Sequence, residues 1–218
     1  MTNVSSNNKK GAFKAEDCSI SINGVLFSKS LNGASDMTEQ IDENKIVMSS
    51  NAKTDFFNAP YGDQRQADAQ VLLHTINNKE PFTFTVKVRP EFSETYDAGA
   101  AYMFVNNEHW LKFAFEMDEK KETRIVTVRT EKTSDDNNHD EVTEKYAYLK
   151  ISSDVNTIGF YYSIDKVKWQ LVRVLKNEFP EPVYIGISSQ SPRGDGIKVA
   201  FEDVSLTNEA IKDFRKGV

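Results

Sequence analysis

Cysteine is almost missing from this 218-residue chain, whose only one is Cys18. An internal disulfide is therefore excluded. The fold depends on an ordinary core, for which the length suffices because a chain of this size buries roughly 70% of its unfolded surface. We expect Cys18 to be a small buried hydrophobe, because a reactive thiol needs a neighbouring histidine or cation and the sequence points to none.

Long apolar runs and basic runs are missing as well. No stretch approaches the roughly 20 apolar residues of a membrane-spanning helix. The first 13 residues, MTNVSSNNKKGAF, lack the apolar segment of a secretory signal. The formal net charge is −6 and the pI about 5.2, without the basic stripe typical of nucleic-acid-binding proteins. We therefore expect a cytoplasmic protein with no membrane partner and no nucleic-acid partner.

Strand-like alternation dominates what is present. FTFTVKVRP (82–90) places Phe and Val on one face and Thr, Lys and Arg on the other, and Pro90 ends the pattern because it cannot donate to a ladder. Short strands at regular spacing with turn signals between them predict an all-β, antiparallel sandwich or barrel. The other strands are expected at 98–105, 109–117, 123–130, 145–151, 157–164, 168–175, 183–190 and 197–206, with earlier candidates at 18–24 and 45–50 before an irregular loop at 51–66.

The two ends of the chain are expected to lie outside the sandwich. The N-terminal residues are polar and are expected to be disordered. NEAIKDFRKG (208–217) forms either one or two helical turns, with Ile211 and Phe214 facing inward, or a frayed tail. The predicted layout is a tail over 1–12, one β-sandwich domain over 13–207, and a C-terminal tail or short helix over 208–218.

Two carboxylates one residue apart raise the question of catalysis. In HWLKFAFEMD (109–118), Glu116 and Asp118 point to one face, roughly 7 Å apart along the strand. A retaining glycosidase needs two carboxyls about 5–5.5 Å apart. The β-glucanase arrangement adds a third acid at the next alternate position, where this chain has Lys120. We conclude that this constellation is not catalytic and that the strand runs into a solvated turn.

The same strand offers a candidate ligand-binding face. Trp110, Lys112 and Glu116 alternate along it, and an aromatic platform beside polar groups is the usual make-up of an open binding groove. Tyr161 and Arg173 join this face if their strands are neighbours in the same sheet, and Arg173 would then pair with Glu116 or with a ligand anion. The alternative is structural: Trp110 covers a sheet edge and Lys112 pairs with Glu116 along the strand.

Metal and nucleophile motifs are incomplete. SDDNNHDE (134–141) matches the first positions of a calcium loop, but Glu141 replaces the required glycine and Ala147 the final glutamate. The histidines lack zinc-ligand spacing, and GISSQSPRG (186–194) lacks the strand–turn–helix of a nucleophile elbow. We therefore expect no metal, no cofactor and no catalytic residue, and we predict a solvated acidic loop at 134–141.

Four stretches in the same order resemble one known family. They are KTDFFNAPYGD (53–63), YDAGAAYMFVNNEHWLKFAFE (96–116), SIDKVKWQLVR (163–173) and IGISSQSPRGDGIKVAFEDVSL (185–206). The corresponding family patterns are T-D-F-W … Y-G, Y-D-x-A-G … W-L-K … E, S-x-D-G-x-x-W-x-x-V-R and G … S-P … G … F. The family is the domain-of-unknown-function 1349 family, which includes the fungal regulation-of-enolase protein, and the likeness covers roughly residues 53 to 206.

The chain departs from the family pattern at turns and at aromatic positions. Phe57 and Asp136 stand where Trp is usual. Glu131 and Lys132 replace an Asn-Gly pair, and Lys166 replaces a hairpin glycine. If the aromatic positions contact a ligand in relatives, this chain binds a different ligand or none.

The resemblance implies a concanavalin A-like jelly roll of two antiparallel sheets with a concave face. That fold hosts many lectin and glycanase functions, and fold does not determine function. The first hypothesis is a non-catalytic, lectin-like binding module for a carbohydrate, a sugar phosphate or a similar polar ligand on the candidate face. The second is a cytoplasmic regulatory protein that acts through a protein partner, and the third is a glycoside hydrolase. The oligomeric state stays open.

Overall fold

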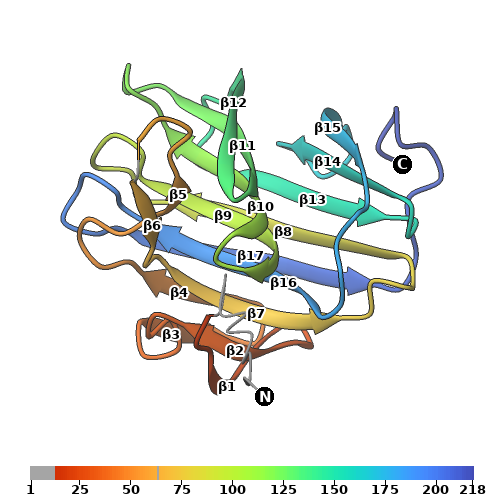
Figure 1. Ribbon diagram of the computed structural model, residues 1–218, viewed down its shortest axis with the longest axis horizontal. Coiled ribbons are helices and arrows are strands. Elements are labelled where there is room, and N and C mark those ends of the chain that lie inside the picture. Colours follow the sequence, from red (N-terminus) through yellow and green to blue (C-terminus); the bar gives the residue numbers. More distant parts are fainter. Residues whose placement is uncertain (1–12, 63) are drawn as a thin grey trace, which may run out of the picture.

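The computed structural model describes residues 13–62 and 64–218, in which seventeen strands form two large sheets and a separate hairpin (Figure 1). The segment expected to be disordered, 1–12, lies outside the described residues. Every strand pair is antiparallel. The prediction of an all-β, antiparallel two-sheet sandwich is confirmed.

The order of strands across each sheet differs from their order in the sequence. The eight-stranded sheet consists, in spatial order, of β1 (Glu16–Ile22), β2 (Val25–Leu31), β7 (Gln70–Ile76), β16 (Val183–Gln190), β9 (Ala98–Asn106), β10 (His109–Met117), β11 (Thr123–Glu131) and β12 (Thr133–Glu141). The seven-stranded sheet consists of β15 (Gln170–Lys176), β14 (Thr157–Ser163), β13 (Ala147–Ser153), β8 (Phe82–Pro90), β17 (Lys198–Thr207), β4 (Lys45–Ser49) and β3 (Thr38–Asp42). The separate hairpin pairs β5 (Phe56–Asn58) with β6 (Arg65–Ala67).

The main core lies between the two sheets and follows the alternation in the sequence. Strand β8 turns its Phe and Val side chains inward, and β10 does the same with Leu111, Phe113 and Phe115. Phe113 stacks on Phe160 of the opposite sheet, with ring centroids 5.0 Å apart. Each such buried side chain stabilises the fold by about 1.5–3 kcal/mol through the hydrophobic effect. The predicted division of β10 into a core face and an opposite face is therefore present.

A second apolar cluster lies on the outer face of the eight-stranded sheet. Phe56 of β5 sits edge-on to Tyr102, Phe104 and Trp110, with ring centroids 5.8–6.0 Å apart. The β5–β6 hairpin thus lies across β9 and β10, as Figure 1 shows. Because the hairpin covers this face, every residue of β10 except its two terminal ones is buried.

Two segments expected to be loops contain strands. Residues 134–141 lie in β12, an edge strand whose side chains are mostly exposed. An edge strand needs no apolar alternation, and charged side chains protect it from pairing with other chains. Segment 51–66, expected to be irregular, contains β5 and part of β6, whose three-residue length is too short to show a period. Strand β7 is absent from the predicted set. Its central residues VLLH are apolar on both faces, so they show no alternation that would indicate a strand.

The C-terminal segment contains no helix, so the alternative of a short helix at 208–217 is wrong. Side chains of the seven-stranded sheet hold this segment in an irregular path instead. The Tyr161 hydroxyl donates to the Phe214 carbonyl at 2.7 Å, and the Lys150 ammonium donates to the Gly217 carbonyl at 3.0 Å. Within residues 13–62 and 64–218, no helix is long and apolar enough to cross a membrane.

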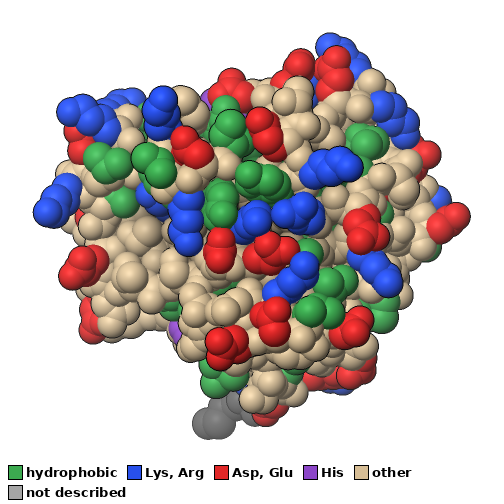
Figure 2. Space-filling view, turned by 180° about the vertical axis from the view of Figure 1, so that it is seen from behind, with side chains coloured by type: hydrophobic (Ala, Val, Ile, Leu, Met, Phe, Trp, Pro, Cys, Tyr) green, Lys and Arg blue, Asp and Glu red, His purple; other side chains and the backbone are tan. Residues whose placement is uncertain are grey.

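The face seen from behind carries charges of both signs. Figure 2 shows Lys and Arg side chains lying among Asp and Glu side chains across its centre. On the outer face of the seven-stranded sheet, Glu202 pairs with Lys87 at 3.0 Å and with Lys45 at 3.1 Å. Because the charges are interleaved, this view offers no large patch of a single sign.

Candidate functional site

A cleft of about 350 Å³ opens on the outer face of the eight-stranded sheet. The β5–β6 hairpin forms one wall and β12 another, and the turns that follow β10 and β16 complete it. Strands β10 and β11 supply Lys112, Glu116, Val126 and Val128 to its floor. The lining residues that matter below are Asp55, Tyr61, Lys112, Glu116, Asp136 and Gln190.

Lys112 is a buried cation that fixes the hairpin to the sheet. Its ammonium donates to the Asp55 carboxylate at 3.1 Å, to the Phe56 carbonyl at 3.0 Å and to the Gln190 side-chain oxygen at 3.3 Å. Three acceptors use all three of its donors. Burial lowers the pKa of Lys112, but the surrounding acidic groups, Asp55 first among them, together outweigh it and leave the pKa above its usual range. Lys112 therefore stays charged and works as a positioning residue for the cleft wall.

Glu116 is the buried acid of the cleft. Its residue is only 8% exposed, and its carboxyl makes no hydrogen bond or ion pair with any described residue. Burial raises its pKa to about 8, and the positive charge of Lys112 only partly offsets this. Near neutral pH the carboxyl is therefore protonated, with both donor and acceptor capacity directed at the cleft. The alternative in which Lys112 pairs with Glu116 is not what the structure shows, because Lys112 pairs with Asp55.

Replacing Glu116 with Gln should stabilise the protein at neutral pH. The pKa of Glu116 is raised from 4.5 in the unfolded chain to about 8 in the folded state, so between these values the unfolded state loses its proton first. The free energy of unfolding thus falls as the pH rises through this window, and glutamine escapes that loss. We expect Glu116→Gln to gain about 3 kcal/mol at about pH 7 and almost nothing at about pH 4, measured by urea denaturation.

A matched control is Glu43→Gln, which removes an exposed carboxyl on the β3–β4 turn. Its effect should be small and similar at both pH values. A Glu116→Gln variant that is less stable than the original protein at neutral pH would show that the folded state uses an ionised Glu116.

The structure separates the five residues predicted for the ligand-binding face. Lys112 and Glu116 both line the cleft. Trp110 is completely buried beneath Phe56, and its indole donates to the Asn107 carbonyl at 3.4 Å, so it offers no platform to a ligand. Tyr161 and Arg173 lie on β14 and β15 of the seven-stranded sheet, and the expectation that these strands neighbour β10 is wrong.

Sequence reasoning missed four cleft residues: Asp55, Tyr61, Asp136 and Gln190. Tyr61 is 74% exposed and supplies the aromatic surface that Trp110 does not. Signals for all four were present, since Asp55 and Tyr61 lie in the first stretch that resembles the family, Gln190 lies in the fourth, and Asp136 is a departure from the family pattern. Only the pairing of β16 with β9 brings Gln190 to the cleft.

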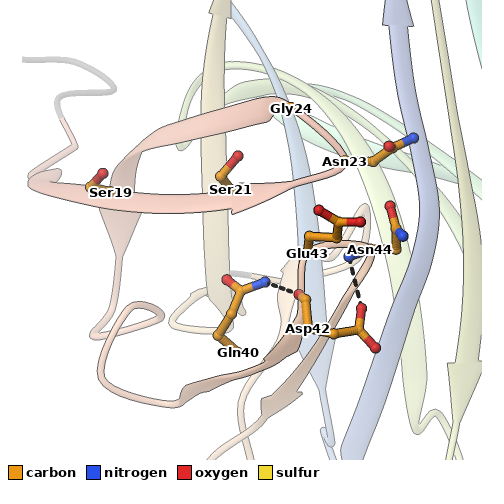
Figure 3. Close-up of a pocket in the computed structure, with 8 residues that line it drawn as sticks. All are labelled: Ser19, Ser21, Asn23, Gly24, Gln40, Asp42, Glu43 and Asn44. Carbon is orange, nitrogen blue, oxygen red and sulfur yellow. Dashed lines mark hydrogen bonds between the residues drawn. The ribbon is translucent and has the colours of Figure 1, made fainter.

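A second depression, of about 420 Å³, lies between the β1–β2 and β3–β4 turns (Figure 3). Its polar groups largely satisfy one another: Gln40 donates to the Asp42 carbonyl at 2.5 Å, and the Asn44 amide donates to the Asp42 carboxylate at 2.8 Å. No buried acid faces it in the described part of the chain. We therefore place the candidate site in the cleft that contains Glu116.

Comparison with known sequences identifies relatives across most of the chain. The model of the family described as "Protein of unknown function (DUF1349)" matches residues 33–209. The protein named "Regulation of enolase protein 1" from Saccharomyces cerevisiae is 25% identical over 170 residues, which are 75% of this chain and 81% of that protein.

Solved structures share the fold at lower sequence identity. A protein of unknown function from Saccharomyces cerevisiae superposes with a TM-score of 0.74 at 23% identity, covering 84% of this chain and 96% of that one. A xylan β-1,4-xylosidase from Bacillus halodurans matches with a TM-score of 0.55 at 11% identity, covering 72% of this chain but only 32% of that one. These likenesses show a common β-sandwich architecture.

Proposed function

The chain belongs to the DUF1349 family, and from this premise we propose that it is a non-catalytic binding module whose cleft takes a short carbohydrate or a similar polar ligand. The cleft volume of about 350 Å³ is within the range of small-molecule sites, roughly 300–1,000 Å³. The lining combines an exposed tyrosine, an unpartnered acid and several side-chain amides. The tyrosine ring could stack on a sugar ring, and the acid and the amides could form hydrogen bonds with sugar hydroxyl groups.

The observation that carries this proposal is the buried, unpartnered carboxyl of Glu116. Burial disfavours the ionised form of this carboxyl, and an acid without a partner among the described residues is rare in such a place unless it serves a function. A glutamine or an apolar residue here would avoid this penalty. A ligand that hydrogen-bonds to Glu116 would supply the missing partner.

The Bacillus halodurans chain is described as a xylan β-1,4-xylosidase, and the present chain matches about a third of it. That likeness concerns fold, so the choice of a carbohydrate rests on the cleft of this chain.

A thermal-shift screen with gluco-, xylo- and manno-oligosaccharides tests the proposal. A ligand that binds only the folded state raises the melting temperature with the logarithm of its concentration. We expect Tyr61→Ala to weaken the affinity about tenfold, because an aromatic contact contributes about 0.5–1.5 kcal/mol beyond its buried area. The matched control is Tyr146→Ala. Tyr146 is half-buried and packs against Lys87 of the other sheet, so its replacement should leave the affinity unchanged.

The other outcomes of the screen favour the other hypotheses. No shift with any oligosaccharide at millimolar concentration would reject the proposal and favour a cytoplasmic regulatory protein with a protein partner, consistent with the name of the yeast relative. Exposed apolar side chains at Ile164, Val167 and Val174, beside edge strand β15, would then be the first surface to examine. New reducing ends that disappear in Glu116→Gln would favour a glycoside hydrolase.

A further inference from the structure

The acids around the cleft fall into two groups. Asp55 pairs with Lys112 at 3.1 Å, and Asp118, at the end of β10, pairs with Arg124 at 2.6 Å. Glu116, Glu119 and Asp136 have no cation within ion-pair distance among the described residues, although all three line the cleft. The negative potential of the site is therefore only partly neutralised by the protein itself.

Two of these acids, Glu116 and Asp136, lie in surroundings that favour their protonated forms. Burial raises the pKa of both, and the charge of Asp136 also raises that of Glu116. Lys112 acts in the opposite direction on each of them. A positive charge brought to Glu116 by a ligand would oppose the effect of burial and favour its ionised form.

We infer that the ligand of this cleft is a carbohydrate with a free primary amino group, such as a glucosamine residue, whose ammonium contacts the carboxyl of Glu116 while Asp136 adds negative charge along the same cleft. The inference rests on the proposed carbohydrate-binding function and specifies its ligand. An ammonium makes charge-assisted hydrogen bonds to carboxylates, which are about twice as strong as neutral ones. The exposed ring of Tyr61 at the same cleft adds a face that attracts cations.

The charges that line the cleft disfavour an anionic ligand such as a sugar phosphate. The lining cations are Lys112 and Arg193, and the lining acids are Asp55, Glu116, Glu119 and Asp136. Lys112 has already used its donors, and Arg193 lies over the ring of Tyr96, 4.7 Å from its centroid. A metal ion is a poorer fit, because the described residues contain no group of three His, Cys, Asp or Glu side chains that could hold one.

Binding of an ammonium moves a proton. The groups that face Glu116 are Lys112, Asp55, Asp118, Asp136 and the hydroxyl of Tyr102. The carboxyl holds its proton near neutral pH, since its pKa is raised to about 8. When an ammonium arrives, Glu116 releases this proton to the solvent and a carboxylate–ammonium pair forms. Affinity should therefore increase as the pH rises from about 6 toward about 7, as long as the amine stays charged.

The test compares three tetrasaccharides with the same β-1,4-linked glucose backbone that differ only at carbon 2: the glucose, N-acetylglucosamine and glucosamine tetramers. Isothermal titration calorimetry at about pH 6 should show the glucosamine tetramer binding at least about tenfold more tightly than the glucose tetramer. Its heat should depend on the ionisation enthalpy of the buffer, because a proton is released. In Glu116→Gln the ratio of the two affinities should fall toward one.

Glu43→Gln is the control for non-specific attraction between a cationic sugar and an acidic protein. It replaces a carboxyl outside the cleft and should keep the affinity ratio of the unmodified protein. Tighter or equal binding of the glucose or N-acetylglucosamine tetramer would overturn the inference but leave the proposed function standing. An affinity ratio that survives Glu116→Gln would overturn it too. If none of the three tetramers and no oligosaccharide in the screen binds, both the inference and the proposed function are rejected.

Discussion

Replacing Trp110 with alanine should destabilise the folded protein by about 3–5 kcal/mol, as expected for a fully buried aromatic residue. Its side chain is completely buried and packs edge-on against Phe56 and obliquely against Tyr102, with ring centroids 6.0 Å apart in both pairs. Removing the indole leaves a large cavity between the hairpin and the sheet, which the antiparallel ladders on both sides of β10 prevent from collapsing. Urea denaturation measures the change, and a loss of this size is a large part of the total stability of a single domain.

The chain offers Trp169 as a matched control, because it is the other tryptophan and is only half-buried. Its ring lies 3.6 Å from the ammonium of Lys150, at the surface of the seven-stranded sheet. Trp169→Ala should therefore destabilise the protein less than Trp110→Ala does. If Trp110→Ala changed the stability by less than about 1 kcal/mol and abolished sugar binding instead, Trp110 would be a stacking platform rather than a core residue.

Strand β10 shows how far the sequence could predict the fold and the site. Its alternation gave the boundaries of the strand, the core face with Phe113, and the opposite face with Lys112 and Glu116, because side-chain direction has a period of two and is a local property. The rejected catalytic reading of Glu116 and Asp118 follows from the same local geometry, and Asp118 is occupied by Arg124.

What covers the opposite face is not a local property. Trp110 is buried because Phe56, more than fifty positions earlier in the chain, lies on it, and the short strands of that hairpin have no period to reveal them. The assignment of Tyr161 and Arg173 to the same face failed for a related reason. Alternation predicts on which side of a strand a residue lies, but not which sheet of a sandwich contains the strand.

Replacing Lys112 with methionine, which keeps most of the side-chain volume, should cost about 3–5 kcal/mol of stability, because it breaks a buried ion pair from one side. The Asp55 carboxylate would stay partly buried without its cation, and the acceptors on Phe56 and Gln190 would lose their donor. The loss should be concentrated in the β5–β6 hairpin. Hydrogen exchange should show faster exchange of the hairpin amides than of those in β8.

The double variant Lys112→Met with Asp55→Asn separates the ion pair from the other contacts of the ammonium. Asparagine keeps the side-chain oxygen that accepts the Phe56 amide at 2.7 Å and removes the uncompensated charge. We expect it to recover part of the lost stability, while the acceptors of Phe56 and Gln190 stay unpaired. If Lys112→Met were as stable as the original protein and kept its hairpin protected, apolar packing of Phe56 alone would hold the wall. If the double variant recovered nothing, the loss would come from those neutral acceptors. In the expected case, the cation on the candidate face stabilises the wall of the cleft, which leaves Glu116 as its unpartnered buried acid.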